Sequence, residues 1–195
     1  MRRHPAAARH YGELLKPTMR VASVLDIDLD WLRAQGIKGF IFDLDDTLVH
    51  ALAPHAEEKI SAFITQIRTE FEIYIVSNNF SHQRVDVAAR HLEMRFVARA
   101  KKPSRRFFRH ALAEMGLQAD QVAIVGDQLF TDVLGGNRLG AVTVLVDPLS
   151  REHKWHRRVM RTLEHQLLQL GGSRYHSRHP AREPAAPQST HDPHR

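Results

Sequence analysis

Residues 39–50 read GFIFDLDDTLVH, an apolar run that leads into three closely spaced carboxylates. Phe and Ile without polar alternation are typical of a strand that is buried on both faces of a parallel sheet. Asp43, Asp45 and Asp46 then stand at the mouth of this strand, where mutual repulsion and loss of hydration both disfavour carboxylates. Three acids at such a position indicate a functional site, with a polar strand-to-helix turn as the alternative.

Apolar runs of the same kind recur along the chain and alternate with helical patterns. They are found at residues 72–77, 95–98, 122–126 and 142–146. Apolar residues also return at helical spacing from residue 60 to 71, and residues 81–92 and 104–116 read as amphipathic helices. This alternation predicts an α/β fold with a doubly wound parallel sheet and right-handed crossovers. Ligands of such sheets bind at the carboxyl ends of the strands.

The length and composition fit one such domain with an extension at each end. The chain has 195 residues and a formal net charge of +6, and it contains no cysteine. Without cysteine there is no disulfide framework, no Cys-based zinc site and no thiol nucleophile. We expect an N-terminal extension (1–38) that packs on a core domain (39–150), followed by a basic amphipathic helix (151–170) and a disordered tail (171–195).

Polar side chains follow the later strands as well. These residues are Ser77, Asn78, Lys101, Lys102, Asp127 and Asp132. The serine hydroxyl and the helix N-terminal amides after it are suited to phosphate oxygens. One of the two lysines is placed to neutralise a phosphoryl group, and the two aspartates suit a hard cation.

The motif D-x-D-x-T-L at residues 43–48 does not fit a calcium loop. Such a loop requires Gly at its sixth position and Glu at its twelfth, where this chain has Leu48 and Pro54. A magnesium site with a reactive carboxylate remains as the interpretation. Phosphate monoesters hydrolyse extremely slowly unaided, so an enzyme benefits from a covalent aspartyl-phosphate and from a metal that neutralises the dianion.

Taken in order, the motifs resemble those of the haloacid dehalogenase (HAD) superfamily of phosphohydrolases. The matching stretches are FDLDDTLV, SNN, AKKP and GDQLFTD. The resemblance implies Asp43 as the nucleophile and Asp45 as the general acid and base. It also implies Mg²⁺ held by Asp43, the Asp45 main-chain carbonyl and Asp127, with Asp132 supporting the metal shell.

The same resemblance implies which residues hold the phosphoryl oxygens. Ser77 and Asn78 come from the second motif, and a lysine comes from the third. Related sequences place this lysine directly before proline, which favours Lys102 over Lys101.

A narrower resemblance covers roughly residues 14–160. The stretches LLKPTMRVASVLDIDLDWLRAQGIKG, AKKP and GDQLFTDVLGGNRLGAVTVLV are similar to the YqeG branch of subfamily IIIA. That branch is similar to the mitochondrial and plastid phosphatidylglycerophosphate phosphatases. Asp46 is one departure, because this branch commonly has Asn there; the change leaves the catalytic assignment standing and adds local negative charge.

The spacing between the motifs leaves no room for a cap domain. Only 33 residues lie between Asp43 and Ser77, and 24 lie between Ser77 and Lys102. An open site suits a phosphate displayed on something large, and the resemblance implies phosphatidylglycerophosphate or a similar lipid-borne phosphate. The alternatives are a HAD phosphatase of a soluble sugar, nucleotide or protein phosphate, and a non-catalytic RNA-binding module.

The expected partners follow from charge and hydropathy. No apolar run approaches the roughly 20 residues that span a bilayer, so we expect a cytoplasmic protein that is at most peripheral to a membrane. The basic segment at residues 151–161 either attracts anionic lipid or packs its apolar stripe on the sheet. Nucleic acid is not an expected partner, because the tail has a single aromatic residue, Tyr175, and no stacking array.

Overall fold

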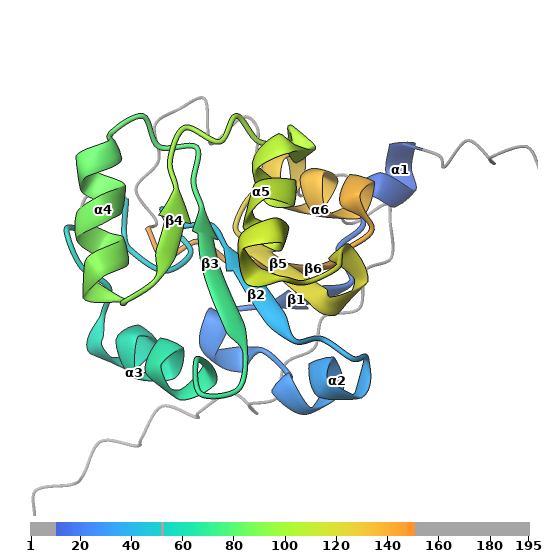
Figure 1. Cartoon of the computed structure of the whole chain (residues 1–195), viewed down its shortest axis with the longest axis horizontal. Coiled ribbons are helices and arrows are strands. Elements are labelled where there is room, and N and C mark those ends of the chain that lie inside the picture. The colour runs from blue at the N-terminus through green and yellow to red at the C-terminus, as the bar shows by residue number, and fades with distance from the viewer. Residues whose placement is uncertain (1–10, 52, 151–195) are drawn as a thin grey trace, which may run out of the picture.

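A computed structural model describes residues 11–51 and 53–150 of the chain, and these form an α/β fold around one parallel sheet (Figure 1). The six strands are ordered β1-β6-β5-β2-β3-β4, and every neighbouring pair is parallel. The strands are β1 (Met19–Val21), β2 (Gly39–Phe42), β3 (Glu72–Val76), β4 (Arg95–Val97), β5 (Val122–Gly126) and β6 (Val142–Val146). The predicted fold class is therefore confirmed.

Helices cover both faces of the sheet, so the fold is doubly wound (Figure 1). The α-helices are α1 (Tyr11–Leu14), α2 (Leu29–Ala34), α3 (Glu58–Ile67), α4 (His82–His91), α5 (Arg105–Met115) and α6 (Leu134–Leu139). Short turns of other helix types are η1 (Val24–Asp26), η2 (Ala119–Gln121) and the π-helical η3 (Leu129–Val133). The three helices expected from periodicity correspond to α3, α4 and α5, each shorter than the pattern that predicted it.

The strand β2 shows how the sequence builds two cores. Successive side chains of a strand point to opposite faces, so an apolar run supplies both layers at once. Phe40 and Phe42 belong to the core cluster under α3 and α4, whereas Ile41 belongs to the cluster under α5. All three side chains are fully buried. This two-sided burial explains why the strand lacks polar alternation and why its first polar residue marks the sheet edge.

The N-terminal segment contributes an edge strand that the sequence patterns did not predict. β1 pairs in parallel with β6, from Met19 opposite Val144 to Val21 opposite Val146. Beside this pairing, the Thr18 main-chain N–H donates to Thr143 Oγ1 over 3.1 Å. The sheet therefore extends beyond the predicted core domain into the segment that precedes it.

The described connections at the carboxyl edge contain no additional domain. Between Asp43 and Lys102 the described chain contains α3, β3, α4, β4 and the loops that join them, and none of these forms a cap. No helix within the described ranges is long and apolar enough to cross a membrane. The predicted basic helix (151–170) and tail (171–195) lie outside the described residues.

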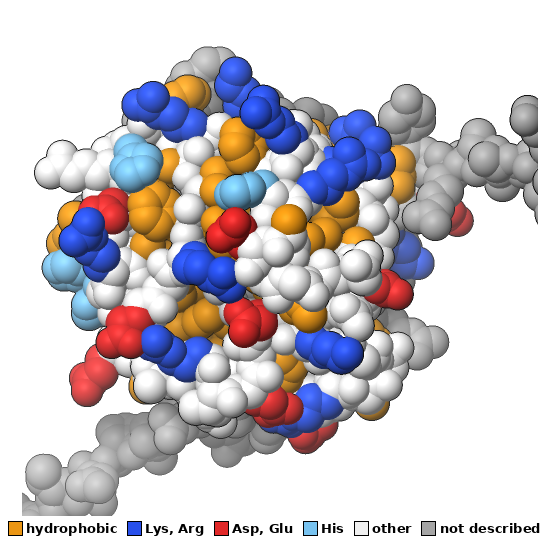
Figure 2. Space-filling model, in the orientation of Figure 1, with side chains coloured by type: hydrophobic (Ala, Val, Ile, Leu, Met, Phe, Trp, Pro, Cys, Tyr) orange, Lys and Arg blue, Asp and Glu red, His pale blue; other side chains and the backbone are white. Residues whose placement is uncertain are grey.

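Exposed basic side chains lie along the carboxyl edge of the sheet on one face of the molecule (Figure 2). The chain turns from β3 into α4 and from β4 into α5 at the top of Figure 1. Figure 2 shows Lys and Arg side chains along this upper edge, and both basic and acidic side chains lower on the same face. The edge where ligands of parallel sheets bind therefore has a basic rim.

A glycine allows α6 to lie against the sheet. A Cβ atom built on Gly136 would come within 2.5 Å of Thr143 Cγ2 and 3.3 Å of Ile124 Cδ1. Both neighbours are β-branched side chains on strands, which have little freedom to move away. Gly140, which ends α6, has a φ of 90°, in the left-handed region that glycine adopts readily.

We predict that Gly136→Ala lowers the free energy of unfolding by about 1–3 kcal/mol, because the added methyl group overpacks the contact with β5 and β6. Urea denaturation followed by circular dichroism measures the change. Gly12→Ala is the matched control, because nothing lies within 4 Å of a Cβ atom built on Gly12. Equal losses in the two variants would contradict the packing argument.

Candidate active site

The predicted site residues converge at the carboxyl edge of the sheet. Asp43 follows β2 directly, and Asp127 follows β5, the strand beside it. Ser77 follows β3, and Lys102 lies in the loop after β4. Asp132 lies in η3, a π-helical turn of the kind that is often found at functional sites. Residues spread over ninety positions of sequence therefore come from four neighbouring strand ends.

A buried lysine joins two of the carboxylates. Lys102 Nζ lies 2.8 Å from Asp43 Oδ1 and 2.7 Å from Asp132 Oδ1. The exposed fractions of these side chains are 1% for Lys102, 6% for Asp43 and 2% for Asp132. Buried charges are tolerated only when they are paired and hydrogen-bonded, as these are. The positive charge of Lys102 therefore offsets part of the repulsion among the buried carboxylates.

Burial and the neighbouring charges together raise the pKa of both Asp43 and Lys102. Desolvation is the largest cause that raises the pKa of Asp43, the charge of Lys102 opposes it and the negative charge of Asp132 adds to it; together they raise this pKa to about 6. Desolvation lowers the pKa of Lys102, but the charges of Asp132 and Asp43 outweigh it and raise that pKa above its ordinary value. Lys102 is thus held in its charged form at neutral pH.

Three carboxylates form a donor set for a divalent metal ion. One oxygen each from Asp43, Asp127 and Asp132 lies within 4.8 Å of the other two, and all three residues are buried. Hard divalent cations prefer such oxygen ligands. The donor chemistry therefore fits the cation that the sequence motif predicts.

The residues of the second motif shape the lysine loop. The Asn78 side chain accepts a 2.7 Å hydrogen bond from the Lys102 main-chain N–H and donates to the Lys102 carbonyl over 3.3 Å. Ser77 is buried, and its hydroxyl oxygen accepts from the Asn79 main-chain N–H over 3.1 Å. Asn78 thus positions the main chain that carries the lysine, and the prediction that it contacts phosphate stays a prediction.

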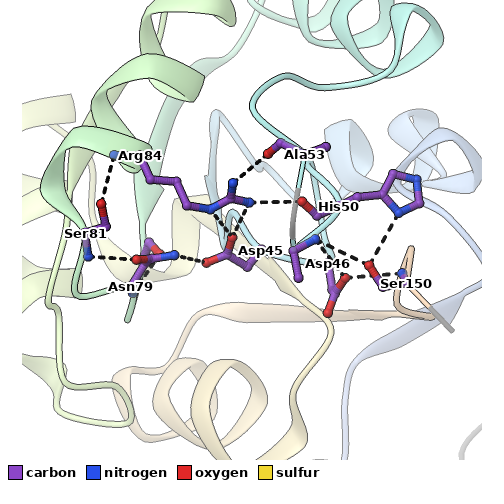
Figure 3. Close-up of polar contacts among 10 residues, drawn as sticks. Asp45, Asp46, His50, Ala53, Asn79, Ser81, Arg84 and Ser150 are labelled. Carbon is purple, nitrogen blue, oxygen red and sulfur yellow. Dashed lines mark hydrogen bonds and ion pairs between the residues drawn. The ribbon is translucent and has the colours of Figure 1, made fainter. Parts of the chain in front are cut away.

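Asp45 is held by Asn79, in the loop before α4, and by Arg84, on α4 (Figure 3). Its Oδ1 accepts from Arg84 Nε over 3.1 Å and from Arg84 Nη2 over 2.8 Å, and its Oδ2 accepts from Asn79 Nδ2 over 2.7 Å. Arg84 also donates to the carbonyls of Ala53, over 2.6 Å, and His50, over 3.0 Å. The carboxylate of Asp45 is not one of the three that form the metal donor set. Arg84 therefore fixes both Asp45 and the loop that follows it.

Asp46 has a different function from its acidic neighbours. Its φ of 63° lies in the left-handed region, where Asp and Asn are the best tolerated residues after Gly. Its buried side chain accepts hydrogen bonds from the main-chain N–H groups of Ala51, over 3.3 Å, and Ser150, over 3.2 Å (Figure 3). Asn can adopt the same conformation and offer the same acceptor, so the local geometry explains why Asp or Asn fits this position.

The structure distinguishes the two candidate lysines and adds two residues. Lys102 is buried in the charge cluster, whereas Lys101 is exposed. Asn79 and Arg84, the partners of Asp45, were missed by sequence reasoning. Asn79 directly follows the predicted residues Ser77 and Asn78 in the SNN motif, so the sequence could have indicated it. Arg84 was not, because a basic residue in an amphipathic helix is usually solvated.

The chain matches a family model and curated relatives over most of its core. The model described as mitochondrial PGP phosphatase covers residues 10–149. The chain is 34% identical over 153 residues to the probable phosphatase YqeG of Bacillus subtilis, covering 78% of this chain and 88% of that protein. It is 30% identical over 167 residues to phosphatidylglycerophosphate phosphatase 1, chloroplastic/mitochondrial, of Arabidopsis thaliana.

The extent of these matches differs between relatives. The match to the Arabidopsis protein covers 80% of this chain but only 48% of that protein, so the chain spans about half of that relative. Among solved structures, a hypothetical protein from Xanthomonas campestris is 16% identical with a TM-score of 0.50, covering 80% of this chain and 81% of the other. That likeness concerns the fold alone.

The fold, the strand-end site and the relatives together define a phosphatase of the HAD superfamily, a phosphoric monoester hydrolase of the YqeG type. The predicted resemblance is confirmed. Within that class, the chain belongs to the family of the mitochondrial PGP phosphatases. Family membership favours catalysis over the non-catalytic RNA-binding module considered from the sequence.

We predict that Arg84→Gln lowers kcat for a small soluble ester, p-nitrophenyl phosphate, about 10–100-fold with little change in KM, because Asp45 and its loop lose their anchor. Arg84→Lys should recover part of the loss, since it keeps the charge without the two-nitrogen contact. Steady-state kinetics provides the measurement.

Arg90→Gln is the matched control for this prediction. Arg90 lies on the same helix and pairs with Asp86, and its side chain is 79% exposed. If Arg84→Gln and Arg90→Gln show the same kinetics, Arg84 does not position Asp45 for the reaction.

Proposed function

We propose that the chain is a Mg²⁺-dependent phosphomonoester hydrolase that acts through an aspartyl-phosphate on phosphatidylglycerophosphate or a similar lipid-borne phosphate. The observation that carries the proposal is the buried cluster at the uncapped sheet edge. There Lys102 bridges Asp43 and Asp132, and Asp127 completes the carboxylate set. This arrangement provides a nucleophile, a fixed positive charge and metal ligands within one site.

In the first half of the proposed reaction, a carboxylate oxygen of Asp43 attacks the phosphorus atom of the monoester. The bond between phosphorus and the alcohol oxygen breaks, and Asp45 gives a proton to the departing alkoxide. Lys102 and Ser77 hold the phosphoryl oxygens, and Lys102 offsets their charge as it develops. The products of this half are the free alcohol and a phosphorylated Asp43.

In the second half, Asp45 takes a proton from a water molecule that attacks the same phosphorus atom. The bond between phosphorus and the Asp43 oxygen breaks, which regenerates the carboxylate and releases inorganic phosphate. Arg84 and Asn79 orient Asp45 through the contacts already described. Asp45 thus regains in the second half the proton that it gave up in the first.

The metal site in this proposal uses the carboxylate set. Asp43, Asp127 and the main-chain carbonyl of Asp45 would hold Mg²⁺, and Asp132 would support the shell. When bound, the ion neutralises charge on the phosphate dianion and on the clustered carboxylates.

Two features favour a lipid-borne substrate over a soluble phosphate. The Arabidopsis relative is named a phosphatidylglycerophosphate phosphatase, and the site edge of this chain carries no cap within its described residues. A headgroup at a membrane surface can reach such an edge, and the enzyme then works as a peripheral protein on the cytoplasmic side. A soluble sugar, nucleotide or protein phosphate remains the second candidate, because it needs the same catalytic residues.

Asp43→Asn is expected to abolish turnover of phosphate esters while the protein still folds, because the amide has nearly the same shape but is not a competent nucleophile. Asp46→Asn is the matched control three positions along the chain and should keep most of its activity. Phosphate release with p-nitrophenyl phosphate, together with circular dichroism, measures both. Turnover by Asp43→Asn close to that of the control would rule out the covalent mechanism.

Removal of the metal should silence the wild-type enzyme, and Mg²⁺ should restore it after chelation by EDTA. Mg²⁺ should also raise the melting temperature of the wild type, because a ligand that binds the folded state stabilises it. In Asp127→Asn this thermal shift should be much smaller, whereas Asp120→Asn, which changes an exposed acid, should behave like the wild type. A full thermal shift in Asp127→Asn would exclude that residue from the metal site.

The substrate is tested with a panel of phosphate esters. Purified protein is assayed against phosphatidylglycerophosphate, sugar phosphates, nucleotides and a phosphopeptide at equal concentration. We expect kcat/KM to be highest for the lipid by at least about tenfold. A soluble ester that exceeds the lipid would replace the substrate part of the proposal and leave the mechanism unchanged.

A further inference from the structure

The most exposed large apolar side chain of the described residues lies beside the candidate active site. Phe80 is 79% exposed, compared with 36–37% for Leu25, Trp31 and Val87. The residue directly before it, Asn79, contacts Asp45. Exposing a phenylalanine to water loses the free energy that its burial would give. Single exposed apolar residues are common on protein surfaces, so the residues beside Phe80 decide whether it marks a contact surface.

The loop that contains Phe80 and the loop joined to it carry basic residues and no acidic ones. Residues 77–82 and 98–104 contain no Asp or Glu, whereas the second loop carries the exposed Arg99 and Lys101. Arg99 Nε donates to the Phe80 carbonyl over 2.8 Å, which joins the two loops. The positive rim in Figure 2 lies along this edge of the sheet.

The two basic residues of the second loop have an energetically unfavourable backbone conformation. Arg99 has a φ of 55° and Lys101 a φ of 52°, in the left-handed region that residues with long side chains seldom adopt. Conformations of this kind persist where the surrounding structure enforces them, and they cluster at functional sites. Here they accompany two exposed positive side chains next to an exposed aromatic ring.

A hollow beside α4 includes Ser81, the residue that follows Phe80. This hollow has a volume of about 320 Å³ and is lined by Pro54, Ser81, Gln83, Arg84 and Val87. Arg84, on its wall, is the residue that holds Asp45. The hollow therefore lies between the residue that follows Phe80 and the arginine that holds Asp45.

We propose that Phe80, with Arg99 and Lys101, forms a surface that docks the enzyme on an anionic phospholipid bilayer, with the Phe80 ring inserted at the interface. Aromatic side chains settle at the boundary between headgroups and acyl chains, and each nearby cation is attracted by the negative surface potential. Because the surface adjoins the open site, docking brings a phosphate of the lipid headgroup toward Asp43. This inference rests on the proposed lipid substrate and adds the surface that meets the membrane.

The test uses the full chain and compares Phe80→Ser with Phe80→Trp. We expect Phe80→Ser to bind vesicles containing phosphatidylglycerol about tenfold more weakly than the wild type in co-sedimentation, and Phe80→Trp to retain binding. Trp31→Ser is the matched control, because Trp31 is an exposed aromatic residue on α2, which precedes the amino end of β2. It should bind like the wild type. Binding should also weaken with salt and on neutral phosphatidylcholine vesicles.

A second measurement separates docking from chemistry. Short-chain phosphatidylglycerophosphate, kept monomeric below its micelle concentration, presents the same headgroup without a membrane. Phe80→Ser should hydrolyse this monomer like the wild type and should lose about tenfold in turnover of the long-chain lipid in vesicles.

The possible failures are distinguishable. If the wild type does not hydrolyse the monomeric lipid, the proposed substrate is wrong. If Phe80→Ser binds anionic vesicles as well as the wild type, or if the wild type does not bind them, the docking surface is wrong. In the latter case a protein partner becomes the candidate for this surface.

Discussion

The salt bridges of Lys102 are the constraint on which the rest of the site depends. A fully buried ammonium group faces Asp43 on one side and Asp132 on the other. Removing one partner of a buried ion pair typically costs about 3–5 kcal/mol, because a charge is left without compensation. The strand ends that carry these residues are therefore tied to one arrangement, and so is the loop whose main chain Asn78 grips at Lys102. Stability and function require the same geometry.

Two further residues fix the segment that follows the nucleophile. Asp46 ties the loop after β2 to Ser150, beyond β6, while Arg84 ties the same loop to α4. Ser150 follows β6 and α4 follows β3, and these two strands lie on opposite sides of β2 in the sheet. The loop is therefore held from both sides. Asp45 stands between these anchors. In the proposed mechanism the three closely spaced acids have separate functions: Asp43 is the nucleophile and a metal ligand, and Asp45, oriented by Arg84, is the acid and base. Asp46 is a structural hydrogen-bond acceptor.

Much of the fold was predictable from the sequence, because buried parallel strands have continuous apolar runs and amphipathic helices have apolar residues at helical spacing. The edge strand β1 was not, because three residues, MRV, are too short for any period, and its pairing with β6 depends on a distant segment. The strand-end acids and the lysine were predictable because topology alone brings such positions to one edge. The pairing of Arg84 with Asp45 was not, since it depends on how α4 packs across the loop. The different function of Asp46 also required its backbone conformation, which local sequence does not determine.

The central claim is that Asp43 becomes covalently phosphorylated during turnover, and trapping that intermediate tests it most directly. The enzyme is mixed with saturating phosphate ester and Mg²⁺ and quenched in acid within one turnover, and its peptides are analysed by mass spectrometry. The account predicts a phosphate group on the peptide that contains Asp43, located at that residue by fragmentation and absent when the ester is omitted. Phosphate on another residue, or hydrolysis through the same turnover with no phosphorylated peptide, would contradict it.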